Sequence, residues 1–359
     1  MRARHHVTAG ASLIAIALCA APAATNQERP AGQGFAFRSA VELINVTVTV
    51  TDEQGRFVRG LRLEDFELYE EGTRQTISQF DAERVPVSLG IALDTSGSML
   101  GEKIAAAQAA LNRFLFELLG PQDEVFLYRF DGRPNLVQGW TEDRGELARA
   151  LGSVKPNGGT AMYDTVAEAV PLAQSGSRRK KALVVISDGN DTSSRTRVGE
   201  LRNLIRQSEV LVYAIGIDAS GSDSDYRSRP AASTSAPARP RSVPTPTPFP
   251  GMKPPPQKAA TPPRPPSRPP ARATTSSSID RVNPDALREI TDDSGGRTEI
   301  IVSPRDLDPT TAGIADELSR QYFLGYTSTL PKDGRWHTIE VRVKKGNYTV
   351  RARRGFIAN

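Results

Sequence analysis

Cysteine and histidine are scarce in this 359-residue chain, which contains one cysteine, Cys19, and three histidines. A single cysteine cannot close a disulfide within the chain, so packing, with or without a bound ion, has to hold the fold together. His337 is the only histidine beyond the first six residues. This scarcity argues against nucleophilic catalysis by a Ser–His or Cys–His pair and against a histidine-ligated zinc site.

Long apolar runs are also missing, apart from one at Ala11–Ala21. Arg2 and Arg4 precede this run, and Ala21-Pro22-Ala23 follows it as a small-x-small cleavage signal. The run is too short to span a bilayer comfortably. We therefore predict a signal peptide at residues 1–23, a mature chain without a transmembrane segment, and a secreted or periplasmic location.

The net charge of +5 is unevenly distributed. Residues 219–278 hold 16 of the 27 prolines and nine Lys or Arg against two Asp, so the remainder of the mature chain is mildly acidic. Such a Pro-rich composition cannot bury an apolar face, which predicts a disordered or polyproline II insertion. The basic charge therefore gives no case for specific binding of nucleic acid by the folded part.

The central part of the chain alternates apolar strand patterns with amphipathic helix patterns, which is typical of a parallel sheet with helical crossovers. Val87–Leu93 and Lys181–Ser187 are nearly continuous apolar runs, as expected of strands buried on both faces. We predict an α/β fold with a doubly wound, mostly parallel, Rossmann-like sheet. Its domain comprises residues 85–218 and 279–321, and the Pro-rich insertion at 219–278 separates the two parts.

The flanking segments have the pattern of antiparallel strands. Ala40–Thr51 alternates apolar and polar residues, and we predict a hairpin of Phe66–Tyr69 with Arg74–Phe80 around Glu71-Gly72-Thr73. This N-terminal β unit, residues 36–84, has too few strands to close on its own. The strand patterns within residues 322–359 are expected to complete it.

Three loops that follow predicted strands or precede a predicted helix carry oxygen ligands. Asp94, Ser96 and Ser98 alternate after the first central strand, Thr160 follows two glycines, and Asp188 follows another buried strand. In open α/β sheets, ligands bind beyond the carboxyl ends of the strands. Two carboxylates and three hydroxyls suit a hard cation, namely Mg²⁺, with Mn²⁺ or Ca²⁺ as alternatives.

This order of residues, DxSxS…T…D, resembles the von Willebrand factor type A domain with its metal-ion-dependent adhesion site, over Val87–Arg320. The resemblance implies that Ser96 and Ser98 bind the ion directly, that Asp94 and Asp188 hold it mainly through water, and that Thr160 binds directly or through water. It also implies one open coordination position, which an Asp or Glu side chain of a protein partner fills. The stretches FELYEEG and YFLGY resemble secreted bacterial proteins of the same superfamily.

The leading hypothesis is therefore a non-enzymatic, extracytoplasmic binding or adhesion module. One alternative is a metal-dependent phosphoester hydrolase with Asp94 as its nucleophile. Against it, Ser96 stands where such enzymes carry a second acid, and no Lys-bearing motif is evident. A further alternative is an assembly scaffold in which the site is vestigial.

Overall fold

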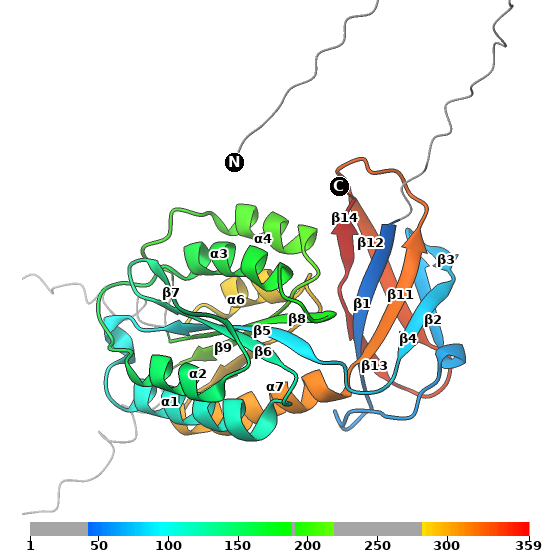
Figure 1. Cartoon of the computed structure of the whole chain (residues 1–359). Helices are drawn as coiled ribbons and strands as arrows, with labels where there is room; N and C mark the ends of the chain where they lie inside the picture. The colour runs from blue at the N-terminus through cyan, green and yellow to red at the C-terminus, as the bar shows by residue number, and fades with distance from the viewer. Residues whose placement is uncertain (1–41, 189–190, 219–281, 359) are drawn as a thin grey trace, which may run out of the picture. The chain divides into compact units, whose positions relative to one another are not determined.

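The computed structural model describes residues 42–188, 191–218 and 282–358 (Figure 1). The predicted signal peptide, residues 1–23, and the predicted Pro-rich insertion, residues 219–278, lie outside the described residues. The proposed boundaries between the parts of the chain stay predictions.

A central sheet of six described strands forms the α/β part. In spatial order the strands are β10 (Thr298–Ile301), β9 (Leu211–Ile217), β8 (Lys180–Ser187), β5 (Val87–Asp94), β6 (Glu124–Phe130) and β7 (Pro134–Thr141). All neighbouring strands are parallel except β6 and β7, which are antiparallel. The β5 and β8 strands lie in the middle of the sheet, and every residue of β5 is buried, which explains its continuous apolar sequence.

Helices cover both faces of this sheet (Figure 1). One core contains side chains of α1 (Glu102–Arg113), α2 (Arg144–Gly152) and α7 (Leu307–Arg320). The core on the opposite face contains side chains of α3 (Met162–Gln174), α4 (Val198–Gln207) and α6 (Pro284–Thr291). None of the helices in the described ranges is long and apolar enough to cross a membrane.

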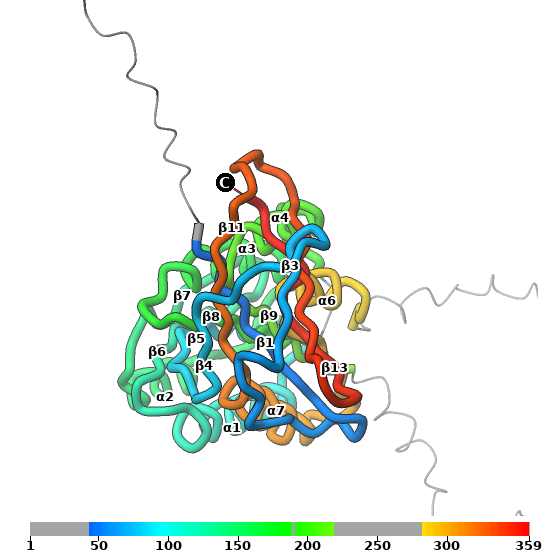
Figure 2. Tube along the Cα trace, turned by 90° about the vertical axis from the view of Figure 1, so that its right-hand side faces the viewer, coloured from blue at the N-terminus to red at the C-terminus, as the bar shows by residue number. Residues whose placement is uncertain are grey.

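Strands from both ends of the chain form two antiparallel sheets that enclose a third core. In the first of them β1 pairs with both β11 and β13, as Figure 2 shows. The strands of that sheet are β13 (Thr349–Ala352), β1 (Glu42–Thr51), β11 (Tyr322–Ser328) and β4 (Ile77–Asp81). Those of the second sheet are β14 (Gly355–Ile357), β12 (Trp336–Val343), β2 (Phe66–Glu70) and β3 (Thr73–Gln75). The predicted fold class, including a small β unit built from N- and C-terminal strands, is confirmed.

The predicted hairpin is shorter than expected. The β2 and β3 strands do pair around the expected turn, where Glu71 and Gly72 both have positive φ. After Thr76, however, the chain leaves this sheet, and β4 pairs with β11 in the other one. There β4 is the second hydrogen-bonded neighbour of β11, an almost wholly buried strand that pairs with β1 on its other edge. Local sequence pattern cannot reveal such a change of sheet.

Candidate functional site

The ends of two neighbouring parallel strands position the predicted carboxylates. The β5 strand pairs with β8 in a register that sets Leu93 opposite Ile186. Asp94 and Ser187 are the next residues on the two strands, and the Ser187 hydroxyl donates a hydrogen bond to Asp94 Oδ2. Asp188 follows at once. The carboxyl edge of the sheet therefore brings the two carboxylates together, as the sequence predicted.

Four of the five predicted ligands form one hydrogen-bonded cluster. The Ser96 amide donates to Asp94 Oδ1 at 2.8 Å. The hydroxyls of Ser96 and Ser98 are 3.0 Å apart, and Ser98 Oγ donates to Asp188 Oδ1 at 2.8 Å. Ser98 lies in a short 3-10 turn, Gly97–Met99, that follows Ser96 directly and sets the two hydroxyls side by side.

Thr160 belongs to a loop that is fastened to the same cluster. The Asn157 amide donates to the Thr95 carbonyl at 2.7 Å, and the Gly97 amide donates to the Gly158 carbonyl at 3.0 Å. Gly158 has a φ of +75°, a conformation that side-chain-bearing residues rarely adopt, so glycine suits this turn. Thr160 itself is 5% exposed. The structure therefore ties the loop before Thr160 to the cluster, whereas the backbone of Thr160 itself bonds with Thr192 and Ser193.

Burial dominates the electrostatics of the site. Asp94 is fully buried, and this burial raises the pKa of its carboxyl to about 6, with a smaller contribution from the negative charge of Asp188. Hydrogen bonds from Ser187 and Ser96 act in the opposite direction and favour the carboxylate. Two neighbouring buried carboxylates repel each other, so the site favours a positive charge between or beside them.

Two residues of this site, Ser187 and Lys103, are not among the predicted ligands. Ser187 could have been found by aligning the ends of the two central strands. Lys103, in the first turn of α1, forms an ion pair with Asp188, whose side chain is fully buried, and only 19% of the lysine side chain is exposed. No sequence signal distinguishes Lys103 from an ordinary surface lysine at the start of a helix.

The donor set fits a hard divalent cation, because it combines two buried carboxylates with clustered hydroxyls and contains no nitrogen or sulfur ligand. Asp94, Ser96, Ser98 and Asp188 are the residues that could hold it, with Thr160 adjacent. Within residues 42–188, 191–218 and 282–358, no group of three or more His, Cys, Asp or Glu side chains could hold a metal ion. A metal site here would therefore complete its two carboxylates with hydroxyls and water.

Two other acids near these loops have structural roles. The Asp164 carboxylate accepts hydrogen bonds from the amides of Arg195 and Thr196. Asp191 accepts from the amides of Tyr163 and Ser194. Both acids thereby tie the loop after residue 190 to the first turn of α3. These hydrogen bonds account for the positions of both carboxylates without a bound ion.

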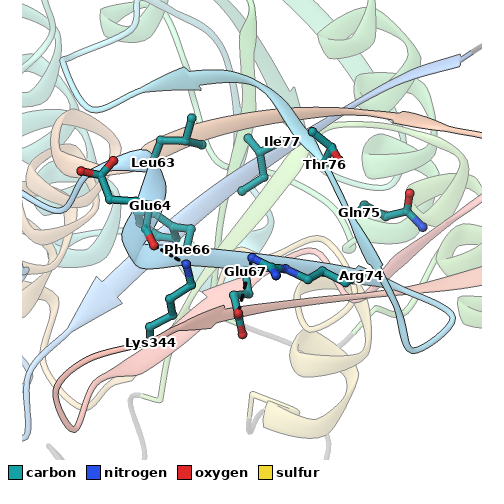
Figure 3. A pocket seen from close by; sticks show the side chains of 9 residues that line it. All are labelled: Leu63, Glu64, Phe66, Glu67, Arg74, Gln75, Thr76, Ile77 and Lys344. Carbon is teal, nitrogen blue, oxygen red and sulfur yellow. Dashed lines mark hydrogen bonds and ion pairs between the residues drawn. The ribbon is translucent and has the colours of Figure 1, made fainter.

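A hollow of about 530 Å³ in the β unit is a weaker candidate for a functional site (Figure 3). Arg74 pairs there with Glu67 at 3.6 Å, and Lys344 donates to the backbone carbonyl of Glu64. The remaining side chains that line it are Leu63, Phe66, Gln75, Thr76 and Ile77. This lining offers no nucleophile or clustered carboxylates, so the cluster at the sheet edge remains the candidate site.

Comparison with known proteins agrees with the fold. Residues 89–190 match the sequence model of the von Willebrand factor type A domain. Heavy chain 4 of the mouse (Mus musculus) inter-alpha-trypsin inhibitor is 29% identical over 128 residues, which cover 32% of this chain and 14% of the relative. The human (Homo sapiens) heavy chain H4 is 26% identical over 136 residues, covering 34% and 14%. The match thus spans about a seventh of these relatives, at 14% of their length.

Two similar solved structures are more distant in sequence. A von Willebrand factor type A protein from Catenulispora acidiphila has a TM-score of 0.44 and 14% identity, covering 89% of this chain and 75% of that one. Proximal thread matrix protein 1 from the mussel byssus, described with a zinc-occupied metal-ion-dependent adhesion site, has a TM-score of 0.45 and 12% identity. That match covers 70% of this chain and 50% of that chain.

Proposed function

We propose that this chain is an extracytoplasmic, divalent-cation-dependent module that binds a protein partner through one of the partner's Asp or Glu side chains. The observation that carries the proposal is the cluster of Asp94, Ser96, Ser98 and Asp188 at the carboxyl edge of the sheet. The match of residues 89–190 to the von Willebrand factor type A domain supports it. Mg²⁺ is the proposed ion, with Mn²⁺ or Ca²⁺ as alternatives.

The hydroxyls and the carboxylates of such a site would have different roles. When bound, the cation supplies a Lewis acid that attracts a carboxylate. The hydroxyls of Ser96 and Ser98 are neutral donors that leave most of its positive charge uncompensated. Asp94 is held by the Ser96 amide and the Ser187 hydroxyl, so it is oriented before any ligand arrives.

The surface beside the cluster has room for a partner. A polar hollow of about 430 Å³ borders the Thr160 loop, and Asn157 belongs to both. Arg129 and Lys155 line it together with Asp131, to which Arg129 is paired at 2.9 Å. The additional lysine gives this hollow a positive balance, which suits an acidic partner segment.

The geometry disfavours the hydrolase alternative. A nucleophilic aspartate has to present a free oxygen to its substrate. Asp94 is fully buried, and each of its carboxylate oxygens accepts a hydrogen bond from the chain. The residue is therefore placed to orient and to bind, and a binding module describes the site better than an enzyme.

The first test is stabilisation by metal. An ion that binds only the folded state, and whose concentration is about 100 times its Kd, stabilises that state by about 2.7 kcal/mol. We expect millimolar Mg²⁺ or Mn²⁺ to raise the Tm of the full chain, and Asp94→Asn to abolish the rise. Glu102→Gln is the control, because Glu102 is an acid of the same region whose side chain is 66% exposed. An identical Tm with metal and with EDTA would contradict the proposal.

The second test concerns the partner. The immobilised chain is incubated with an envelope fraction in Mn²⁺ or in EDTA, in parallel with Asp94→Asn. A protein that the wild type retains in Mn²⁺ alone, and that the variant does not retain, supports the proposal. Hydrolysis of p-nitrophenyl phosphate by the wild type, lost in Asp94→Asn, would instead support the phosphoester hydrolase.

A further inference from the structure

Asp188 already has partners within the chain for both of its carboxylate oxygens. Ser98 Oγ donates to Oδ1 at 2.8 Å, and the Lys103 ammonium pairs with Oδ2. The Asp188 side chain is fully buried, whereas 19% of the Lys103 side chain reaches solvent. The lysine therefore approaches the cluster from the surface and delivers its charge to the buried carboxylate.

This arrangement supplies the positive charge that the cluster requires. Asp94 and Asp188 are both buried, and the hydroxyls of Ser96 and Ser98 connect them in one cluster. Burying carboxylates without a counter-charge is costly, and a direct ion pair offsets that cost. Lys103 belongs to the first turn of α1, so the helix that packs on the sheet also carries the counter-charge to its edge.

We propose that Lys103 is a built-in counter-ion of the candidate metal site, which competes with the divalent cation for Asp188 and so sets the affinity of the site for metal. This inference rests on the proposed function, because it concerns the same site. A cation that binds here has to displace the ammonium from Asp188 or tolerate its repulsion, and both effects weaken metal binding. When the cation dissociates, the same ammonium holds the start of α1 to the loop of Asp188.

The experiment replaces Lys103 with methionine in the full chain. Lys103→Met keeps an unbranched apolar side chain of similar length and removes the charge. We expect Mn²⁺ to bind at least tenfold more tightly to the variant, as measured by isothermal titration calorimetry. In EDTA we expect the variant to have a lower Tm than the wild type, because the buried carboxylates lose their counter-charge.

Arg113→Met is the matched control. Arg113 is a cation of the same helix, and it pairs with Glu117 at 3.0 Å and with Asp308. Its removal changes the net charge by the same amount. We expect a change of less than twofold in Mn²⁺ affinity, so a general charge effect would appear in both variants and a local one in Lys103→Met alone.

A double-mutant cycle adds a readout without metal. The Tm values of Lys103→Met, Asp188→Asn and the double variant are measured in EDTA, and we expect the double variant to lose less stability than the two single losses together. Additive losses, or an Mn²⁺ affinity that Lys103→Met leaves unchanged or weakens, would overturn the role of Lys103. If neither wild type nor Lys103→Met binds Mn²⁺, the proposed function is overturned as well.

Discussion

Replacement of Glu317 by leucine tests whether one buried acid holds α7 to the rest of the protein. Glu317 lies in the last turns of α7, and its side chain is fully buried. It pairs with Arg297 at 3.2 Å and with Arg351 of β13. Its Oε1 atom also accepts hydrogen bonds from Thr49 of β1 at 3.1 Å, Tyr213 of β9 at 2.9 Å and Gln321 at 3.3 Å. One carboxylate thus connects the central sheet, the final helix and the β unit.

The expected cost of Glu317→Leu follows from these contacts. Removing one member of a buried ion pair typically costs about 3–5 kcal/mol, because the remaining charge is left uncompensated. The side chains of Arg297 and Arg351 are 29% and 33% exposed, so water solvates part of the charge they would leave behind. The hydroxyls of Thr49 and Tyr213 would also lose an acceptor. We therefore expect a loss of about 3 kcal/mol in the free energy of unfolding.

The assay is urea unfolding of the full chain, followed by far-UV circular dichroism and by tryptophan fluorescence. Trp140 lies in β7 and Trp336 in β12, so each part of the protein contains a tryptophan. The control is Asp316→Leu, which removes the preceding residue of the same helix. Asp316 is 39% exposed and pairs with Arg320 on the surface, so we expect a loss below about 1 kcal/mol. If Glu317→Leu costs no more than Asp316→Leu, the reasoning is refuted.

Two further predictions concern a buried lysine and a close backbone contact. Burial, with a smaller effect of the Arg84 charge, lowers the pKa of Lys180 to about 8, against opposing effects of Asp123 and Glu317. Between pH 8 and about 10.4 the unfolded chain therefore binds more protons than the folded chain, so the free energy of unfolding of the wild type rises with pH. Raising the pH from 7 to 10 should increase it by about 2 kcal/mol relative to that of Lys180→Met, as measured by urea unfolding. A difference between the two proteins that stays constant with pH would contradict this. In Gly296→Ala, the new Cβ would lie 1.9 Å from the Val212 carbonyl oxygen, so we expect the free energy of unfolding to fall by about 3 kcal/mol or more. In the control Gly199→Ala, the new Cβ has nothing within 4 Å, so the free energy of unfolding should change by less than about 1 kcal/mol. Thermal unfolding of the two glycine variants checks this, and equal Tm values would show that the backbone at Gly296 can move away.

The sequence by itself determined the buried central strands and the order of the candidate ligands along the chain. The continuous apolar runs that became β5 and β8 predicted buried parallel strands, because a strand covered by helices on both faces has no polar side. The alternating residues of β1 predicted a strand with one buried face, which now lies against the third core. Asp94 ends β5 and Asp188 directly follows β8, so their meeting at one edge followed from the parallel arrangement.

Only the tertiary structure decided which partners the charged residues take. Glu317 belongs to an amphipathic helix, and nothing in its neighbours along the chain predicts full burial between two arginines that are close to it only in space. Lys103 likewise has the sequence context of a surface residue, yet it pairs with Asp188, 85 positions away. Apolar burial repeats with the period of a helix or strand, and the local sequence therefore carries it. A charge takes whichever opposite charge the packed elements bring within reach, so its partner is decided when the chain folds.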